Sequence, residues 1–451
     1  MKIEILPLSI LPSDLAVSAA RTCYSSKGLI LPHESSNWSK KDELLKSVFD
    51  AGHHTTLQHT HITLTIEGIS RQLIWRLFHS HPFYNSEQVS QRYAKMQKDS
   101  FIYPYEANKE IWGKYYERIF NTYEVLTTLL TPIMQKTLPK FRKKDAVKKA
   151  QEMARYVLPQ GMSAYMYHTI NIITALRYIM AAKVLPEAQS EAREFARQLS
   201  QKLIELDISL KPLIDFANSS DVEFLSNGFG EIKQRYDVKK SEFVKVLDAM
   251  PLLHAGPIYN YAEILRPFTI FPDASVAGGF SSYIKLSLSA DAQNQRHRAS
   301  LATRPSLKSI YRPDFYEPPI IAENSEISKI YQDAMALSYS FFEEEVLNVG
   351  FGEAVYALPN SHLIEIVEFN DYARFVHKSQ MRLCYNAQQE IFDIVYEQIK
   401  QLKEQNIDTS LFVPPCTIRD RSNIQPICPE GVRYCGEKVW KKDFSELIRL
   451  I

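Results

Sequence analysis

The feature that most constrains the fold of this 451-residue chain is an order of sequence patterns that occurs twice. In the run HTHITLTI, from His59 to Ile66, β-branched and apolar residues alternate with polar ones, which predicts a strand beginning near His59. Apolar residues then follow helical spacing from Ile69 to Phe78. Residues 108–136 and 165–204 also have helical patterns. The second of these is divided into two helices near Leu185-Pro186, because proline disfavours helical backbone in the preceding residue.

The second half of the chain returns to this order. A β-like run at residues 282–288 precedes a stretch rich in arginine and histidine at residues 293–308. Helical patterns follow at residues 325–347 and 364–402. We therefore expect an internal repeat of roughly 200 residues.

This repeat predicts the fold class and the domains. Each half combines a sheet with long flanking helices, so we expect an α/β (α+β) fold made of two tandem domains. The boundary is placed near Lys233–Leu247, the most charge-dense internal stretch, although such a run also fits a solvated helix face. The expected divisions are repeat one at residues 1–230, a charged linker at 231–250, repeat two at 251–405 and a cysteine-containing tail at 406–451.

Composition argues against several classes of partner. Lys and Arg number 53 against 52 Asp and Glu, so the net charge of +1 provides no global field for a nucleic acid or an anionic membrane. The apolar stretch from Tyr165 to Val184 contains Tyr, His, Asn, Arg and Lys, which does not suit a membrane span. With few cysteines and no secretory layout at its start, the chain is expected to be soluble and cytoplasmic.

The first half contains a series of short motifs. In chain order they are Ala20-Arg21-Thr22-Cys23-Tyr24, Gly52-His53-His54-Thr55-Thr56-Leu57-Gln58-His59, Ser70-Arg71, Ser90-Gln91-Arg92-Tyr93, Leu158-Pro159, Thr169-Ile170-Asn171 and Ala188-Gln189-Ser190-Glu191-Ala192-Arg193. This succession resembles the flavin-dependent thymidylate synthase family, whose signature runs Arg-His-Arg, Ser, Asn-Glu and Ser-x-Arg-Tyr.

The second half preserves a different subset of the family's motifs. Its matches are Gln293-Asn294-Gln295-Arg296-His297-Arg298, Ser306-Leu307-Lys308, Asn370, Arg382 and Ala387-Gln388-Gln389-Glu390-Ile391. Together the two sets cover most of residues 1–400. Because several motifs occur in the same order, the resemblance is far more specific than any one of them.

Both halves also depart from the family's pattern. In repeat one, His79-Ser80-His81 stands where Arg-His-Arg is expected, Gln58 replaces a Glu, and Lys183 occupies the equivalent of Arg382. Repeat two lacks the Gly-His run and the final Arg-Tyr of the signature. Neither copy therefore carries a complete family site.

The resemblance implies flavin-mediated one-carbon transfer to C5 of dUMP or a related uracil compound. FAD is the expected cofactor, with methylene-tetrahydrofolate as carbon donor and NADPH as reductant. Negative charge that develops on the uracil ring needs fixed cationic donors, and arginine binds phosphate and carbonyl oxygens through a planar, permanently charged fork. Arg382 and Arg296 are the expected catalytic residues. The expected substrate-binding residues are Gln293, Arg298, Ser306, Lys308, Ser90 and Arg92.

Five further residues are implied as flavin contacts by the resemblance. They are His53, Thr55, Asn171, Asn370 and His297. Each has a simpler interpretation, since a histidine before a strand is more often structural and an asparagine can be a satisfied polar group on a buried helix. Likewise, Arg296-His297-Arg298 alone would fit a solvated basic turn, and Ser90 with Arg92 could cap the segment that follows them.

Three of the five cysteines, Cys416, Cys428 and Cys435, lie in the C-terminal tail. Zinc usually takes four nitrogen or sulfur ligands, and the tail contains no histidine. Cys384 or a residue from elsewhere would have to complete a zinc site. The alternative is that these thiols are simply buried or exposed side chains.

Two function hypotheses follow, from different classes. The first is a flavin-dependent methyltransferase that forms a homodimer, in which four family-like domains make a pseudo-tetramer. The second is a catalytically inactive flavin- or nucleotide-binding protein with a regulatory or structural role. The resemblance of the fold does not decide between them, because function belongs to the site.

Overall fold

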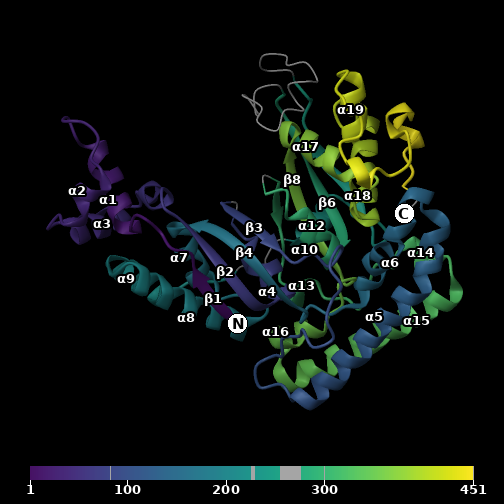
Figure 1. The fold of residues 1–451 in the computed structure, drawn as a ribbon, viewed down its shortest axis with the longest axis horizontal. Coiled ribbons are helices and arrows are strands. Elements are labelled where there is room, and N and C mark those ends of the chain that lie inside the picture. The colour runs from purple at the N-terminus through teal and green to yellow at the C-terminus, as the bar shows by residue number, and fades with distance from the viewer. Residues whose placement is uncertain (82, 225–228, 254–275, 299, 450–451) are drawn as a thin grey trace. The chain divides into compact units, whose positions relative to one another are not determined.

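The computed structural model describes residues 1–81, 83–224, 229–253, 276–298 and 300–449 (Figure 1). Residues 254–275, in the second predicted repeat, lie outside this description. The chain forms two compact units: unit 1 contains Met1–Arg118, Pro159–Leu225 and Ser338–Leu358, and unit 2 contains Ile119–Leu158, Ser226–Leu337 and Pro359–Ile451. Each unit therefore includes a segment from the other half of the sequence.

Unit 1 is built on an antiparallel sheet whose described strands have the order β1-β2-β4-β3. The strands are β1 (Lys2–Ile5), β2 (His61–Ser70), β3 (Tyr84–Gln88) and β4 (Ser163–Asn171). Strand β2 has alternating burial, with Ile62, Leu64 and Ile66 fully buried, because successive side chains of a strand point to opposite faces. The predicted strand near His59 is thereby confirmed.

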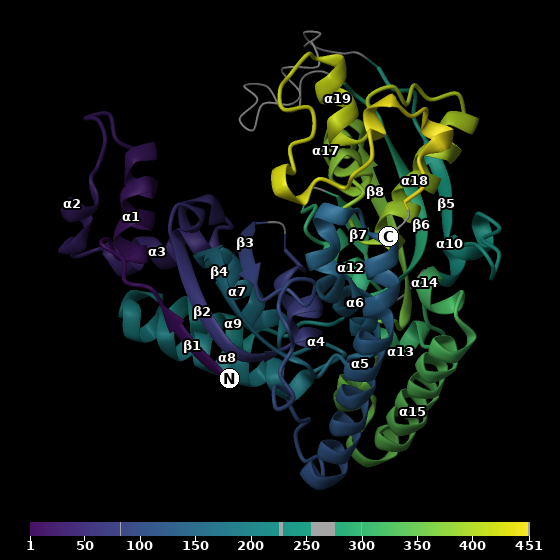
Figure 2. The ribbon, with the colours of Figure 1, turned by 45° about the vertical axis from the view of Figure 1, so that its right-hand side comes forward.

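Helices pack against one face of this sheet, where α8 contacts β1 and α7 contacts β4 (Figures 1 and 2). The helices that lie wholly in unit 1 are α1 (Pro12–Cys23), α2 (Pro32–Ser36), α3 (Lys41–Asp50), α4 (Arg71–Leu73), α7 (Ile172–Ala181), α8 (Gln189–Leu206), α9 (Lys211–Ser219) and α16 (Phe351–Ala354). Buried Phe195, Leu199 and Leu203 lie on one side of α8 at the spacing of an amphipathic helix.

Unit 2 repeats the same strand order, β5-β6-β8-β7, in its described residues. The strands are β5 (Val244–Ala249), β6 (Gly279–Ser287), β7 (Leu301–Thr303) and β8 (Leu363–Asp371). The matching topology confirms two tandem domains of one fold. Residues 231–250, predicted as a charged linker, include part of α10 (Phe229–Arg235) and all of β5.

Several other helices lie wholly in unit 2. They are α6 (Ala146–Ala154), α12 (Leu288–Asn294), α13 (Leu307–Ile310), α14 (Pro319–Ala322), α17 (Tyr372–Arg382), α18 (Gln389–Glu404) and α19 (Pro415–Arg421). Two long helices belong partly to each unit, α5 (Lys109–Thr137) and α15 (Ser325–Val349). Both agree with the helices expected at residues 108–136 and 325–347.

Two predicted helical stretches begin instead as strands. Residues 165–171 belong to β4 and residues 364–371 belong to β8, and the helices α7 and α17 start only after them. Exposed Tyr165 and Tyr167 alternate with buried Met166 and His168, a period of two that the high apolar content of the stretch obscures. The helix expected at Ile69–Phe78 is also shorter, because β2 continues to Ser70.

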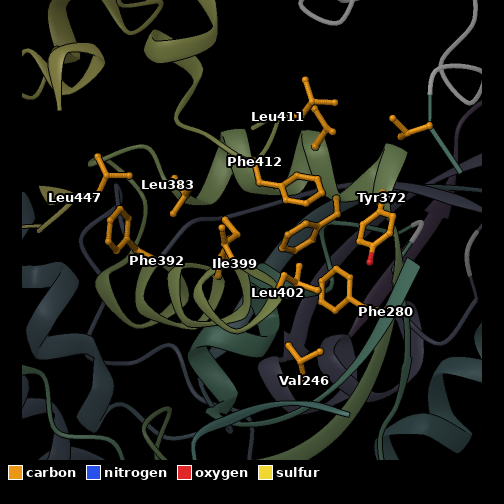
Figure 3. Close-up of a cluster of buried hydrophobic side chains, with 14 of the residues drawn as sticks. Val246, Phe280, Tyr372, Leu383, Phe392, Ile399, Leu402, Leu411, Phe412 and Leu447 are labelled. Atoms are coloured by element: carbon orange, nitrogen blue, oxygen red, sulfur yellow. The ribbon is translucent and has the colours of Figure 1, made fainter. Parts of the chain in front are cut away.

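The core of unit 2 extends into the C-terminal tail (Figure 3). Phe280 of β6, Tyr372 of α17 and Phe412 of the tail lie close together, with ring centroids 5.8–5.9 Å apart for the Phe280–Tyr372 and Tyr372–Phe412 pairs. Leu447, near the end of the chain, is part of the same cluster. The tail therefore contributes to the hydrophobic core of unit 2. Among the described helices, none has the length and apolar content needed to cross a bilayer.

Candidate active site

Arg382 is the centre of the site in unit 2. It lies at the C-terminal end of α17, and its guanidinium binds two residues of the arginine- and histidine-rich segment. Arg382 Nε donates to His297 Nε2 at 2.8 Å, and Nη2 donates to the carbonyl oxygen of Gln293 at 2.8 Å. Nη1 lies 3.5 Å from Gln293 Oε1. The structure therefore brings together three predicted site residues that are up to 89 positions apart.

His297 is held as a neutral acceptor in this arrangement. Burial, followed by the positive charges of Arg382 and Lys378, keeps the pKa of His297 well below its ordinary value. Because Nε2 accepts from Arg382, the ring proton belongs on Nδ1. His297 therefore carries no charge at this contact, and its imidazole fixes the direction of the Arg382 guanidinium.

Glu368 of β8 is a buried carboxylate that binds three side chains in unit 2. It pairs with buried Lys378 and accepts hydrogen bonds from the amides of Asn294 at 2.6 Å and Asn370 at 2.7 Å. Burial would raise the pKa of Glu368, but the adjacent Lys378 and these hydrogen bonds hold it below its ordinary value. Asn370 also accepts from Ser300 at 2.6 Å, so its side chain is already fixed within the fold.

A chain of hydrogen bonds leads from Gln293 into the interior of unit 2. The Gln293 amide donates to Gln388, which donates to Tyr156, and the Tyr156 hydroxyl donates to Glu390 Oε2 at 2.8 Å. Glu390 also accepts the N–H and hydroxyl of Ser287, both at 2.6 Å. Burial raises the pKa of Glu390 to about 7.

Unit 1 contains the counterpart of this carboxylate. Glu191 accepts the Ser70 N–H at 2.8 Å and the Tyr356 hydroxyl at 2.7 Å. Ser70 and Ser287 each also cap a helix start, with their hydroxyls accepting Leu73 N–H at 3.0 Å and Ala290 N–H at 2.9 Å. In each unit, the tyrosine comes from the other half of the sequence.

The remaining candidates of repeat two lie on α13 and on the turn before β7. Arg298 and Lys308 are exposed and Arg296 is half-buried. Buried Ser306 is the N-cap of α13, its hydroxyl accepting from Ser309 N–H at 3.2 Å. Nearby, Arg304 forms a bidentate pair with buried Asp291 at 2.7 and 2.8 Å, which sequence reasoning missed.

The candidates of repeat one have mostly local roles in unit 1. His53 and Thr55 are exposed beside the helical turn His54–Gln58, and the Ser90 hydroxyl accepts from Arg92 N–H at 3.2 Å. Asn171 caps α7 by accepting from Thr174 N–H at 2.8 Å. These bonds agree with the alternatives left open above, which were capping for Ser90 and a satisfied polar group for Asn171.

Lys183, the counterpart of Arg382, has a different set of partners. Its ammonium donates to the carbonyl oxygens of Asn218, at 3.0 Å, and Ser220 at the end of α9. These contacts complement the negative end of a helix. Lys183 is therefore engaged in holding α9, whereas Arg382 is engaged with predicted site residues.

Cys416, Cys428 and Cys435 line one small cavity in unit 2, and Cys384 lines it with them. As the side chains lie, no three His, Cys, Asp or Glu residues in the described part of the chain form a ready set of metal ligands. Cys23, the fifth cysteine, is exposed at the end of α1 in unit 1.

Several residues of these hydrogen-bond networks were not predicted as site residues. Gln388 and Glu390 belong to the Ala-Gln motif of repeat two, so that motif could have identified them. Tyr156 had no such signal, because its partner Glu390 is 234 residues away. Glu368 and Lys378 lie on a strand and a helix that were read as one helical stretch.

Comparisons with known proteins match both halves of the chain. The sequence profile of the family described as thymidylate synthase complementing protein matches residues 9–207 and 278–406. A flavin-dependent thymidylate synthase from Clostridium tetani is 28% identical over 202 residues, covering 44% of this chain and 80% of that protein. One from Geobacter sulfurreducens is 26% identical over 206 residues, with coverages of 44% and 80%. Thymidylate synthase X from Helicobacter pylori, solved with FAD and dUMP, has 17% identity and a TM-score of 0.36, covering 49% of this chain and 100% of that one.

Proposed function

Since the chain belongs to the thymidylate synthase complementing protein family, we propose that it catalyses flavin-dependent methylation at C5 of dUMP or a related uracil nucleotide. Its relatives from Clostridium tetani and Geobacter sulfurreducens are named flavin-dependent thymidylate synthases. The proposed carbon donor is methylene-tetrahydrofolate, and the proposed reductant is NADPH.

The observation that carries this proposal is the fixed guanidinium of Arg382. Attack by C5 on an electrophilic carbon requires electron density to move onto the ring, and a preorganised cation lowers the cost of that charge. Two hydrogen bonds of 2.8 Å, to His297 and Gln293, orient Arg382 before substrate arrives. Because His297 is neutral, it adds no competing positive charge.

The other cations suit the anionic parts of the ligands. Arg298 and Lys308 are exposed and Arg296 is half-buried, so their charges are accessible to a nucleotide phosphate. We propose Gln293 and Ser306 as further substrate contacts of unit 2, and Ser90 and Arg92 as substrate contacts of unit 1.

The exposed cations Arg298 and Lys308 and the half-buried Arg296 would suit the pyrophosphate of FAD as well as a nucleotide phosphate. We propose His53, Thr55 and His297 as residues that contact the cofactor, and Asn171 and Asn370 as residues that support its site. Asn171 and Asn370 already make bonds within their own units, so we assign them to holding the local backbone rather than to direct recognition. When bound, FAD supplies the hydride that converts the transferred carbon to a methyl group. We further propose a homodimer of chains, which contains four family domains.

The test is anaerobic incubation of the purified protein with FAD, NADPH, methylene-tetrahydrofolate and dUMP, followed by mass analysis of the nucleotide. The expected product is dUMP with one additional methyl group, labelled when the methylene carbon is labelled. If folded protein binds FAD but gives no methylated nucleotide with dUMP or UMP, the proposal is wrong and a catalytically inactive flavin-binding role is supported.

A further inference from the structure

Four cysteines of unit 2 line one cavity, and they come from three separate segments of the chain. Cys384 follows the end of α17, Cys416 lies in α19, and Cys428 and Cys435 lie in the tail beyond α19. The cavity has a volume of about 20 Å³. This is enough for a single ion or water molecule and too small for an organic ligand.

Ordinary packing does not readily explain this arrangement. Cysteine can act as a small apolar residue in a core, and Cys416 does belong to the hydrophobic cluster of unit 2. However, four of the five cysteines line this one cavity, although Cys384 and Cys435 are 51 positions apart in the numbering. The described tail beyond α19 contains only short helical turns, at Gly431–Arg433, Val439–Lys441 and Phe444–Glu446. A segment with so little regular structure gains much from a cross-link.

We propose that Cys384, Cys416, Cys428 and Cys435 together bind one zinc ion, which ties the C-terminal tail to the end of α17. Four cysteine thiolates form the tetrahedral set of many structural zinc sites. The thiols must turn toward a common centre, because they are not a ready ligand set as they lie. Each thiol that binds releases its proton to solvent, and no electron is transferred.

The position of Cys384 gives this site a consequence for the proposed reaction. Cys384 lies two residues after Arg382, where α17 ends. A metal bond at Cys384 would restrain the backbone that carries the Arg382 guanidinium. This consequence rests on the proposed function, whereas metal binding itself does not.

Metal content of the full-length chain tests the proposal without any substrate. Protein produced with zinc in the medium, and freed of loosely bound metal by gel filtration, should contain about one zinc per chain by mass spectrometry, as expected for a single four-thiolate site. Cys416→Ser and Cys428→Ser should each reduce that content at least about tenfold, because a structural site needs its full ligand set. Cys23→Ser is the matched control and should retain the metal.

Two further measurements keep the test decisive if the variants fold poorly. Wild-type protein in which Co²⁺ replaces the metal should show the strong absorption of tetrahedral cobalt thiolates. Chelation of the metal should then expose five titratable thiols in denaturant. The proposal is wrong if wild-type protein contains no zinc and its cobalt form shows no thiolate absorption beyond that of a variant in which serine replaces all four cysteines. Fewer than five thiols would point to disulfides instead, and iron at the site would overturn the assignment to zinc.

Discussion

Replacing Arg382 with alanine removes a cation and the hydrogen bonds that fix it. The wild-type guanidinium donates at 2.8 Å to both His297 Nε2 and the Gln293 carbonyl. Alanine leaves these acceptors in place but removes the donor that would meet negative charge developing on the uracil ring. Loss of one preorganised donor of this kind costs about 2.7–4 kcal/mol in the transition state, which is about two to three orders of magnitude in kcat.

The matched control is Lys183→Ala. Lys183 is the residue of repeat one that the family resemblance aligns with Arg382, but it donates to the carbonyl oxygens of Asn218 and Ser220 at the end of α9. Its loss should remove a helix-end interaction worth about 0.3–1 kcal/mol and leave kcat within a few-fold of wild type. Arg382→Lys keeps the charge but loses the planar fork, so we expect an intermediate kcat.

The assay is steady-state methylation of dUMP, with kcat and KM determined separately for each variant. Far-ultraviolet circular dichroism and thermal unfolding must show that each variant is folded. Equal losses of kcat in Arg382→Ala and Lys183→Ala would refute the argument, because both repeats would then contribute a catalytic cation. A change confined to KM in Arg382→Ala would also refute the assigned role in charge stabilisation.

Four other outcomes are expected. Purified protein should show oxidised-flavin absorbance or bind added FAD, and a folded protein that fails to bind it at high micromolar concentration would contradict the cofactor assignment. Arg296→Ala should weaken dUMP binding in calorimetry, because a phosphate loses a charged partner, and unchanged affinity would exclude that role. Sedimentation should give the mass of two chains, so an active monomer would argue against the proposed assembly. Burial raises the pKa of Glu390 to about 7 in the folded protein, above the ordinary value of about 4.5 that applies to the unfolded chain. The stability that depends on protonated Glu390 is therefore fully present below about pH 4.5 and is lost as the pH rises toward 7. The free energy of unfolding, measured by denaturant titration, should fall less between about pH 4.5 and 7 in Glu390→Gln than in wild-type protein. If the two plots of this free energy against pH superimpose, Glu390 does not titrate in that range.

The ordered motifs predicted the tandem fold and named three residues that lie together in the site, although the hydrogen bonds among these residues were not predicted. Arg382, Gln293 and His297 lie together because the strands and helices that carry them follow the order of the repeat. The strands β4 and β8 were missed, since their outward-facing positions hold tyrosine, valine and phenylalanine as well as polar residues, which weakens the alternation.

Other parts of the site depend on contacts that local patterns do not encode. Glu368 and Lys378 form a buried ion pair. Each charge requires the other only because the packing of β8 against α17 removes both from water, which the local sequence does not show. Tyr156 reaches Glu390 across 234 positions, and neither residue has a neighbour in sequence that predicts the other. Lys183 was predicted to occupy the position of Arg382, but its partners at the end of α9 could not be predicted from its charge.

The exchange of residues 119–158 and 338–358 between the two units has an evolutionary consequence. Tyr356 donates a hydrogen bond to the buried Glu191 of unit 1, and Tyr156 donates one to the buried Glu390 of unit 2. A gene divided between the repeats would therefore encode two fragments that each lack a part of their own interior. The two copies are therefore inherited, synthesised and degraded as a pair in fixed ratio. Selection acts on the pair, and one copy can lose residues while the other retains them. His79-Ser80-His81 in one half and Arg296-His297-Arg298 in the other are two different versions of this segment that one chain carries together.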